Sequence, residues 1–123
     1  MKFIHTDKAP QAIGPYSQAV VANGMVYTSG QIALKTDGSM VEDDVVLQTK
    51  QVLKNLDAVL QEAGSSMDKV VKTTIFIASM DDFTIINKIY ENTFGTHKPA
   101  RATVAVKTLP KNALVEIDAV ALI

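Results

Sequence analysis

The sequence of 123 residues contains no cysteine and only two histidines. The absence of cysteine excludes disulfide bonds, thiolate metal sites and a cysteine nucleophile. His5 and His97 stand far apart, and the acidic residues show no spacing typical of metal ligands. These absences argue against a transition-metal centre.

Long hydrophobic runs are absent as well. No apolar stretch approaches membrane-spanning length, and residues 1–8 lack the apolar segment of a secretory signal. We therefore expect a soluble, cytoplasmic protein without a membrane partner. The formal net charge is −1, and acids and apolar residues dilute the lysines, which disfavours nucleic-acid binding through a broad basic face. The length predicts a single domain, residues 1–123, that folds without disulfides.

Arginine occurs only once, at position 101, whereas eleven lysines supply the other positive side chains. Arg101 heads the apolar segment Ala-Arg-Ala-Thr-Val-Ala-Val. The planar guanidinium matches a carboxylate or a phosphate with two parallel hydrogen bonds. One hypothesis is therefore a site for a small anion, and the alternative is a structural arginine that clamps a nearby carboxylate or loop.

Residue periodicity predicts the elements. Extended runs at 17–22 and 25–29 flank Asn23-Gly24, which favours a hairpin with a type I′ turn. Apolar residues at helical spacing predict a helix over 43–63 that stops at Gly64, and a second helix from about 83 that ends near Gly95. Residues 70–78, 101–107 and 114–122 are typical of strands.

The order of these elements predicts an α+β fold, with one mixed sheet and both helices packed on one face. The last two strands are apolar at both odd and even positions. Their second face would be a large exposed apolar patch, which soluble monomers avoid. We infer a homo-oligomer that closes its sheets around a symmetry axis; the alternative is that the amino-terminal segment covers this face.

The pairing of the last two strands decides whether Arg101 meets an acid. A hairpin centred between Leu109 and Pro110 would set Arg101 opposite Asp118 and Thr103 opposite Glu116. Arg101 and Glu116 would then share a face as diagonal neighbours, whereas a slip by one residue would place Glu116 on the other face. The alternative for Glu116 is an ion pair with Lys107 or a solvated edge charge.

Several segments together resemble one known family. They are Ala-Ile-Gly-Pro-Tyr-Ser-Gln from Ala12, Tyr-Thr-Ser-Gly-Gln-Ile from Tyr27, Lys-Thr-Thr-Ile-Phe-Ile from Lys72, Asp-Asp-Phe with Asn87 and Tyr90, and Lys-Pro-Ala-Arg-Ala-Thr-Val, followed by Leu-Pro-Lys and Val-Glu-Ile. In this order, and over essentially the whole chain, they resemble the reactive intermediate deaminase A (RidA, YjgF) family.

The resemblance implies a chorismate-mutase-like fold and a homotrimer with a packed sheet barrel at its centre and ligand sites between subunits. Active members hydrolyse 2-imino acids and their enamine tautomers, such as 2-aminoacrylate, to 2-keto acids and ammonia without a cofactor. By matching motif, Arg101 would hold the substrate carboxylate and Glu116 would position or deprotonate the attacking water. Substrate binding would be completed by Tyr16, Ser29, Gly30, Asn87 and Thr103, the last through its backbone.

Each of these residues also has a structural explanation: Tyr16 fills a loop, Ser29 and Gly30 end a strand, and Asn87 caps or faces solvent on the second helix. The chain departs from the Arg-Ser-Cys-Val-Glu-Val pattern of active members at Ala102, Thr103 and Ala105. A Thr103 backbone contact survives this change, whereas loss of the acid at Ala105 alters the pocket or the subunit interface.

Two other functions stay open from the sequence. A regulatory trimer would bind a small metabolite at Arg101 without turnover. An RNA-cleaving or translation-inhibiting role, proposed for relatives, ranks last because the chain has no arginine cluster or histidine pair for acid-base cleavage of RNA.

Overall fold

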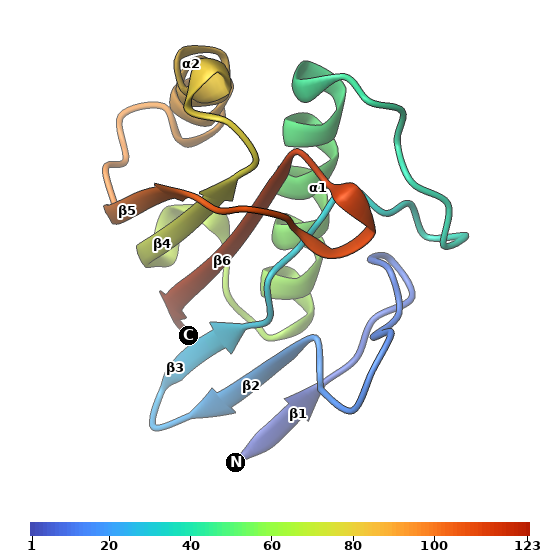
Figure 1. Cartoon of the computed structure of the whole chain (residues 1–123). Helices are drawn as coiled ribbons and strands as arrows, with labels where there is room; N and C mark the ends of the chain where they lie inside the picture. The colour runs from blue at the N-terminus through green and yellow to red at the C-terminus, as the bar shows by residue number, and fades with distance from the viewer.

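The computed structural model describes all 123 residues and contains six strands and two α-helices. Figure 1 shows them in chain order. The elements are β1 (Lys2–Ile4), β2 (Ala19–Ala22), β3 (Met25–Thr28), α1 (Val45–Glu62), β4 (Val70–Ile77), α2 (Phe83–Phe94), β5 (Ala100–Ala105) and β6 (Val115–Leu122), with short 3₁₀ turns at Met67–Lys69, Met80–Asp82 and Pro110–Asn112. Neither helix is both long enough and apolar enough to cross a membrane.

The predicted β2–β3 hairpin is confirmed, with Ala22 paired to Met25. Asn23 has φ 52° and Gly24 has φ 73°, as a type I′ turn requires at both central positions. Both predicted helices are also present. The Asp44 side chain caps α1 by accepting a hydrogen bond from the Leu47 amide at 3.0 Å, and Gly95, with φ 62°, ends α2.

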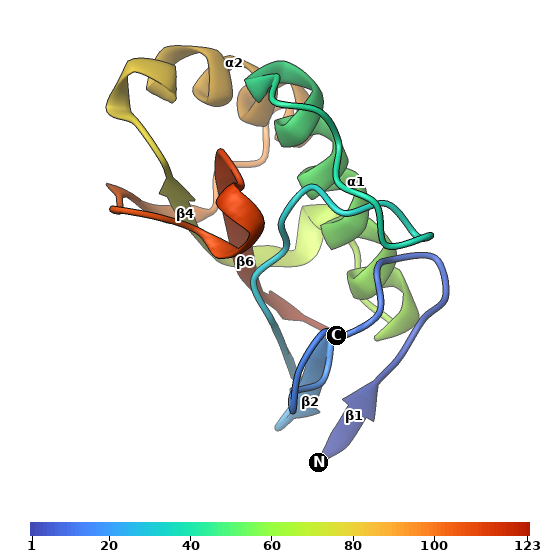
Figure 2. The same ribbon diagram turned by 45° about the vertical axis from the view of Figure 1, so that its right-hand side comes forward.

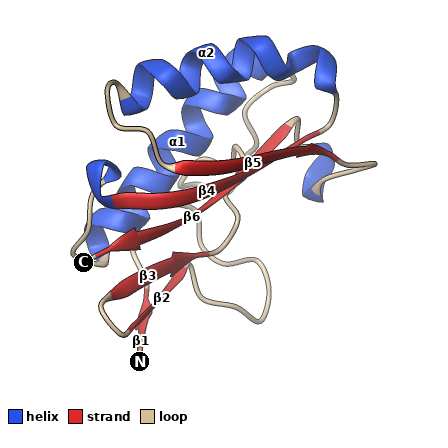
Figure 3. Cartoon of the chain, turned by 90° about the vertical axis from the view of Figure 1, so that its left-hand side faces the viewer, coloured by secondary structure: helices blue, strands red, loops and turns tan.

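All six strands form one mixed sheet in the order β1-β2-β3-β6-β4-β5, which Figure 3 shows from edge to edge. Strand β4 runs parallel to β5, and the two are joined through α2 in a βαβ unit. On its other side β4 pairs with β6 in antiparallel fashion.

This order contradicts the predicted hairpin between the last two strands. Strand β4 lies between β5 and β6, so Thr103 pairs with Ile75 and Glu116 pairs with Phe76 rather than with each other. The prediction failed because it assumed that consecutive strands with a short connection are neighbours. The helical crossover instead places β5 on the outer side of β4, and residues 106–114 carry the chain back across the end of β4.

The two faces of the sheet differ in what covers them. Both helices lie on one side, as predicted (Figure 2), and the main core forms between α1, α2 and the inward side chains of β4 and β6. We call the other side the open face. It exposes Phe3, Tyr27, Val104 and Leu122, which are 69%, 48%, 45% and 48% exposed.

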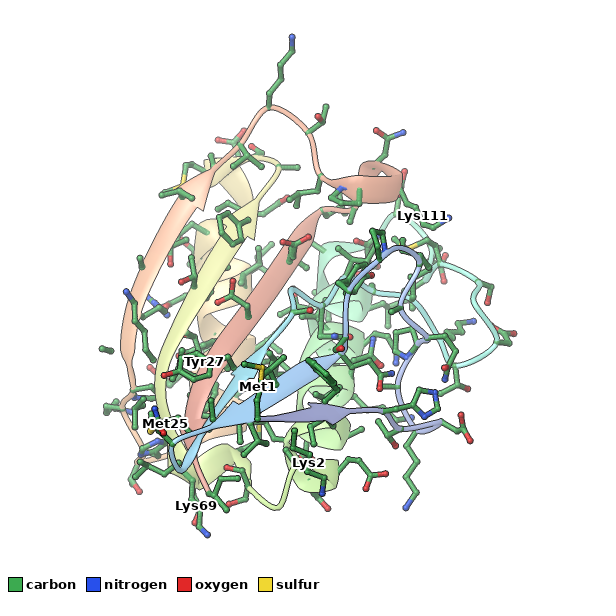
Figure 4. All side chains as sticks on the ribbon, turned by 90° about the horizontal axis from the view of Figure 1, so that it is seen from below. Met1, Lys2, Met25, Tyr27, Lys69 and Lys111 are labelled. Atoms are coloured by element: carbon green, nitrogen blue, oxygen red, sulfur yellow. The ribbon has the colours of Figure 1, made fainter.

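The amino-terminal segment meets the open face only near Glu116, beside residues 10–13 and Tyr16, and does not cover the rest of it. It contributes β1, a short strand that extends the sheet by pairing Phe3 with Val20 of β2. Figure 4 shows Met1, Met25 and Tyr27 gathered at this end of the sheet. The structure therefore leaves the open face apolar and exposed in the single chain, which contradicts the alternative that the amino terminus shields it.

Candidate active site

Arg101 lies at the outer edge of the sheet, against α2. Its Nη1 donates a hydrogen bond to Asn87 Oδ1 at 2.7 Å. Its Cζ lies 5.0 Å from the ring centroid of Tyr90 and 5.8 Å from that of Phe83. Arg101 forms no ion pair, since the two salt bridges of the chain join other residues. The alternative of a carboxylate clamp is therefore wrong within the chain, and most of the guanidinium donors stay available to a ligand.

A cavity of about 410 Å³ opens beside Arg101, between α2 and the start of β5. Asn87 and Tyr90 line it, together with residues near the end of α2. Glu91 is the only carboxylate in the lining. Arg101 therefore brings a positive charge to this cavity that no acid of the chain neutralises in an ion pair. Such a cavity suits an anionic ligand.

A second cavity, of about 320 Å³, contains four of the predicted site residues: Tyr16, Ser29, Gly30 and Glu116. Apolar residues from three loops complete its wall. The Tyr16 hydroxyl accepts a hydrogen bond from the Ile13 amide at 3.2 Å, and Ser29 Oγ donates to the Ser17 carbonyl at 2.5 Å. The loop before β2 and the segment after β3 thus meet the beginning of β6.

Gly30 lies directly against the Glu116 carboxylate. A Cβ atom at position 30 would stand 2.5 Å from Glu116 Oε2, so the glycine is required for this approach. The backbone of the next residue fixes the contact, because Gln31 exchanges hydrogen bonds of 2.9 and 3.1 Å with Ile117. The Glu116 carboxylate itself has no hydrogen-bond or ion-pair partner, which contradicts the suggested pair with Lys107.

Glu116 is half-buried, and burial raises its pKa above the usual range for glutamate. The neighbouring Asp118 carboxylate adds a smaller shift in the same direction. A carboxylate with a raised pKa is a stronger base than one in water. Glu116 therefore has the chemical character of a general base for an attacking water.

Arg101 and Glu116 lie on opposite faces of the sheet. Arg101 is in register with Thr73, which points toward the helices, whereas Glu116 is in register with Phe76, on the open face. Two strand spacings and three residues along the strands separate them, or roughly 14 Å between Cα atoms. The predicted diagonal contact within one chain is therefore wrong, for the reason given above for the hairpin.

The predicted site residues thus form two groups. Asn87, Arg101 and Thr103 belong to the α2–β5 edge, and the other four line the cavity at Glu116. The Thr103 side chain points to the same side as that of Arg101, and its hydroxyl is the only buried side-chain polar atom in the chain without a hydrogen-bond partner.

Sequence reasoning did not predict the buried polar contacts that hold these two groups. Asn55 of α1 donates to the carbonyls of Ile32 and Leu34, at 3.2 and 2.8 Å, and so ties the segment after Gly30 to the helix. Tyr90 bonds Thr73 at 2.7 Å beneath Arg101. The available signal was a polar residue on an otherwise apolar helical stripe, because such a residue requires a buried partner.

Fold and geometry together define an α+β protein with an arginine edge for a small anion and a separate cavity built around a glutamate. The family model described as Endoribonuclease L-PSP matches residues 6–123. The chain belongs to this family, the RidA (YjgF) family of the sequence resemblance.

Three relatives illustrate the similarity. The chain is 48% identical to the 2-iminobutanoate/2-iminopropanoate deaminase of Mus musculus, over 98% of this chain and 90% of the relative. It is 54% identical to YyfA of Yersinia pestis, a member of the Rid protein family, with a TM-score of 0.97 and coverage of 99% and 98%. E. coli TdcF, solved with bound serine, is 40% identical, with a TM-score of 0.95 and coverage of 100% and 99%.

Proposed function

We propose that this protein is a cofactor-independent imine deaminase that hydrolyses 2-imino acids and their enamine tautomers to 2-keto acids and ammonia. The observation that carries the proposal is the division of the predicted site into two incomplete halves. One half has an arginine without an acid, and the other has a glutamate without a cation. The name of the Mus musculus relative supports the same reaction.

We further propose that the working site forms between two copies of the chain, in a homotrimer. The α2–β5 edge of one copy would meet the Glu116 cavity of the next copy, which brings together residues that one chain holds on opposite faces. The exposed apolar side chains of the open face support association, because burial of Val104, Leu122 and their neighbours stabilises contact between copies.

In this arrangement Arg101 holds the substrate carboxylate, and the remaining chemistry takes place at C2. The protonated imine is already electrophilic, so orientation and one base suffice. A water oxygen attacks C2 while Glu116 accepts a proton from that water. Glu116 then passes this proton to the amine nitrogen of the tetrahedral intermediate. As the C–N bond breaks and ammonia leaves, Glu116 accepts the proton of the C2 hydroxyl, which becomes the keto group.

Gly30 and Ser29 complete the water side of the site. The missing Cβ at Gly30 allows the backbone to approach the Glu116 carboxylate closely, and the adjoining cavity has room for a small acid and a water. The Tyr16 hydroxyl accepts a hydrogen bond from the Ile13 amide and keeps its own proton for donation into the cavity, where it would stabilise the tetrahedral intermediate. Ser29 holds the wall of the cavity through its bond to the Ser17 carbonyl.

The test is a coupled assay in which a threonine dehydratase generates the enamine and 2-keto acid formation is followed. The wild-type chain should accelerate it, and Arg101→Ala and Glu116→Gln should each lose most of this effect. A sample in which the two variants are mixed and assembled together distinguishes a site between two copies from a site within one chain. If each site takes Arg101 from one copy and Glu116 from another, about a quarter of the sites regain both residues and activity returns. A site within one chain would give no recovery.

A metabolite-binding regulatory trimer is the second candidate, favoured by the serine bound in E. coli TdcF. It predicts that wild type binds a small 2-keto acid without accelerating the coupled reaction, and that Glu116→Gln leaves binding intact. If the wild-type chain binds a small 2-keto acid but does not accelerate the coupled reaction, the regulatory trimer is supported instead of the deaminase.

A further inference from the structure

One face of α2 is shaped around Arg101. Phe83, Asn87 and Tyr90 are spaced four and three residues apart, so they lie along one stripe of the helix. Asn87 accepts the hydrogen bond from the guanidinium, and the two rings lie within cation–π distance of it. The anion-binding residue of β5 is therefore positioned mainly by contacts with the helix.

Tyr90 is the most restrained member of this stripe. It is nearly fully buried, and its hydroxyl shares a 2.7 Å hydrogen bond with Thr73 Oγ1. Thr73 is the residue of β4 that pairs with Arg101. The Phe94 ring also packs against the Tyr90 ring, with centroids 4.5 Å apart. Strand β4 thus pairs with Arg101 through its backbone and hydrogen-bonds Tyr90 through the Thr73 side chain.

The Arg101 side chain could instead turn toward an acid of the same chain and form an ion pair with it. Glu91 follows Tyr90 directly and is the only carboxylate that lines the cavity beside Arg101. Glu91 is instead 3.6 Å from Lys88. A guanidinium that turned to Glu91 would lose donors needed for an external carboxylate. The aromatic ring stabilises the guanidinium without consuming any N–H donor, whereas Asn87 consumes one.

We propose that Tyr90 is a positioning residue that sets the affinity of the site for carboxylates by holding the Arg101 guanidinium over its ring. The inference rests on the proposed function only in that Arg101 binds the carboxylate of the ligand. Because the ring acts before the ligand arrives, less side-chain entropy is lost on binding. The contacts of Tyr90 are with Arg101 and Thr73, so we expect its effect in binding rather than in the chemical step.

Ring electronics separate this role from simple packing. Tyr90→Phe keeps the ring and serves as the reference, and phenylalanines with an increasing number of ring fluorines at position 90 keep its shape while weakening the attraction for a cation. The probe is 2-oxobutanoate, with its Kd measured by calorimetry. We expect the Kd to rise progressively, by about tenfold at the highest fluorination. The same fluorinated residues at Phe3 of β1, at the opposite edge of the sheet from Arg101, should leave the Kd unchanged.

The single arginine provides a direct structural readout. Because no other arginine is present, the Arg101 Nε–Hε group gives one signal in a nitrogen–proton NMR spectrum. The rings of Tyr90 and Phe83 should both shift this signal in the wild-type chain and in Tyr90→Phe. Tyr90→Leu should remove the Tyr90 part of the shift and leave the part due to Phe83, while the backbone amide signals keep the dispersion of a folded protein. Tyr90→Leu should also weaken 2-oxobutanoate binding by about tenfold.

The outcomes separate this inference from the proposed reaction. If the Kd rises along the fluorinated series but the protein does not hydrolyse imines, the role of Tyr90 is supported and the proposed enzymatic function is contradicted. A flat Kd across the fluorinated series would overturn the role of Tyr90 whether or not the protein is an enzyme. Failure of the folded wild-type chain to bind 2-oxobutanoate would overturn the inference as well.

Discussion

At the residue scale, the site depends on one close approach and one perturbed carboxyl group. Gly30 has no side chain to separate its backbone from Glu116, and Glu116 has no partner to stabilise its charge. Both features lower the local stability of the fold. Such local costs are common where a group is kept for its chemistry rather than for packing.

Gly30→Ala should reduce activity strongly while the chain stays folded. The added Cβ would stand 2.5 Å from Glu116 Oε2, so the carboxylate must move away from the water it activates. Gly30 does not have positive φ, and alanine therefore adds no backbone strain at this position. We expect a loss of about a hundredfold in kcat, measured in the coupled assay, with an unchanged circular dichroism spectrum.

Gly24→Ala is the matched control for this substitution. Gly24 has φ 73° and no neighbouring atom within 4 Å of a built Cβ. Alanine there should lower the free energy of unfolding by about 1 kcal/mol through backbone strain and leave kcat unchanged. Equal losses of activity in both variants would contradict a specific role for the Gly30 contact.

Glu116 should also make stability depend on pH. Its pKa is raised in the folded chain, so the folded state binds the proton more tightly than the unfolded state. The folded state is then favoured at low pH, and stability falls as pH rises from the unfolded pKa through the folded pKa. Glu116→Gln should therefore raise the Tm at pH 7 and have little effect near pH 4, measured by thermal unfolding.

The pH dependence of catalysis has the opposite direction. A general base must be deprotonated, so kcat/KM should decrease as pH falls through the folded pKa of Glu116, which burial places above the ordinary glutamate range. A pH profile of the coupled reaction tests this. An acidic limb at the pKa of an exposed glutamate would contradict the assignment.

At the element scale, α1 and α2 hold the two halves of the site by buried polar contacts. Gln48 of α1 accepts a hydrogen bond from the Leu114 amide at 2.9 Å, just before β6 begins. Asn55, two turns further along the same face of α1, holds the segment after Gly30. α2 supports Arg101. Strands β5 and β6 carry Arg101 and Glu116, and the helices hold these strands and the adjoining loops in place.

Asn55→Ala tests this arrangement by stability. Removal of the amide leaves the Leu34 carbonyl without its donor, whereas the Ile32 carbonyl keeps the hydrogen bond from the Leu34 amide. The loss should cost about 2 kcal/mol in the free energy of unfolding. Urea denaturation measures the change. Gln51→Ala removes only a side-chain hydrogen bond to Asn55 and should cost clearly less. A similar loss of stability in both variants would contradict a specific role for the bonds from Asn55 to the segment after Gly30.

At the scale of the whole molecule, the open face is the feature that the single chain does not explain. It carries exposed apolar side chains from the central and edge strands of the sheet. The helices leave it uncovered, as Figure 2 shows. A second copy of the chain is the proposed cover, and the same contact would complete the site.

Val104→Asp should dissociate the proposed trimer. Val104 is exposed on the open face of β5, and a charge there would be buried without a partner on association. Sedimentation should then give the 13.3 kDa mass of one chain instead of three times that mass, and imine hydrolysis should be lost with it. Leu47→Asp, an exposed leucine on α1, should change neither. A wild-type protein that sediments as a monomer would contradict the composite site.

How much could be predicted differs between the elements. Asn23-Gly24 defined its hairpin and the apolar periodicity defined both helices, because these signals are local in the chain. Strand β1 was missed because Lys2–Ile4 is short and mostly exposed, so it has no clear alternation. The pairing of β5 failed because the βαβ crossover, and not the length of the final connection, decides which strand lies beside β4.

The sequence by itself determined the α+β class, the helices, the apolar character of the open face and the candidate binding and catalytic residues. Residue type and local spacing encode these features. Only the tertiary structure decided that Arg101 faces α2 while Glu116 faces away from it. The reason is physical: side chains alternate between the two faces of a sheet, so the face of each residue depends on strand order and register, which arise from contacts distant in the chain.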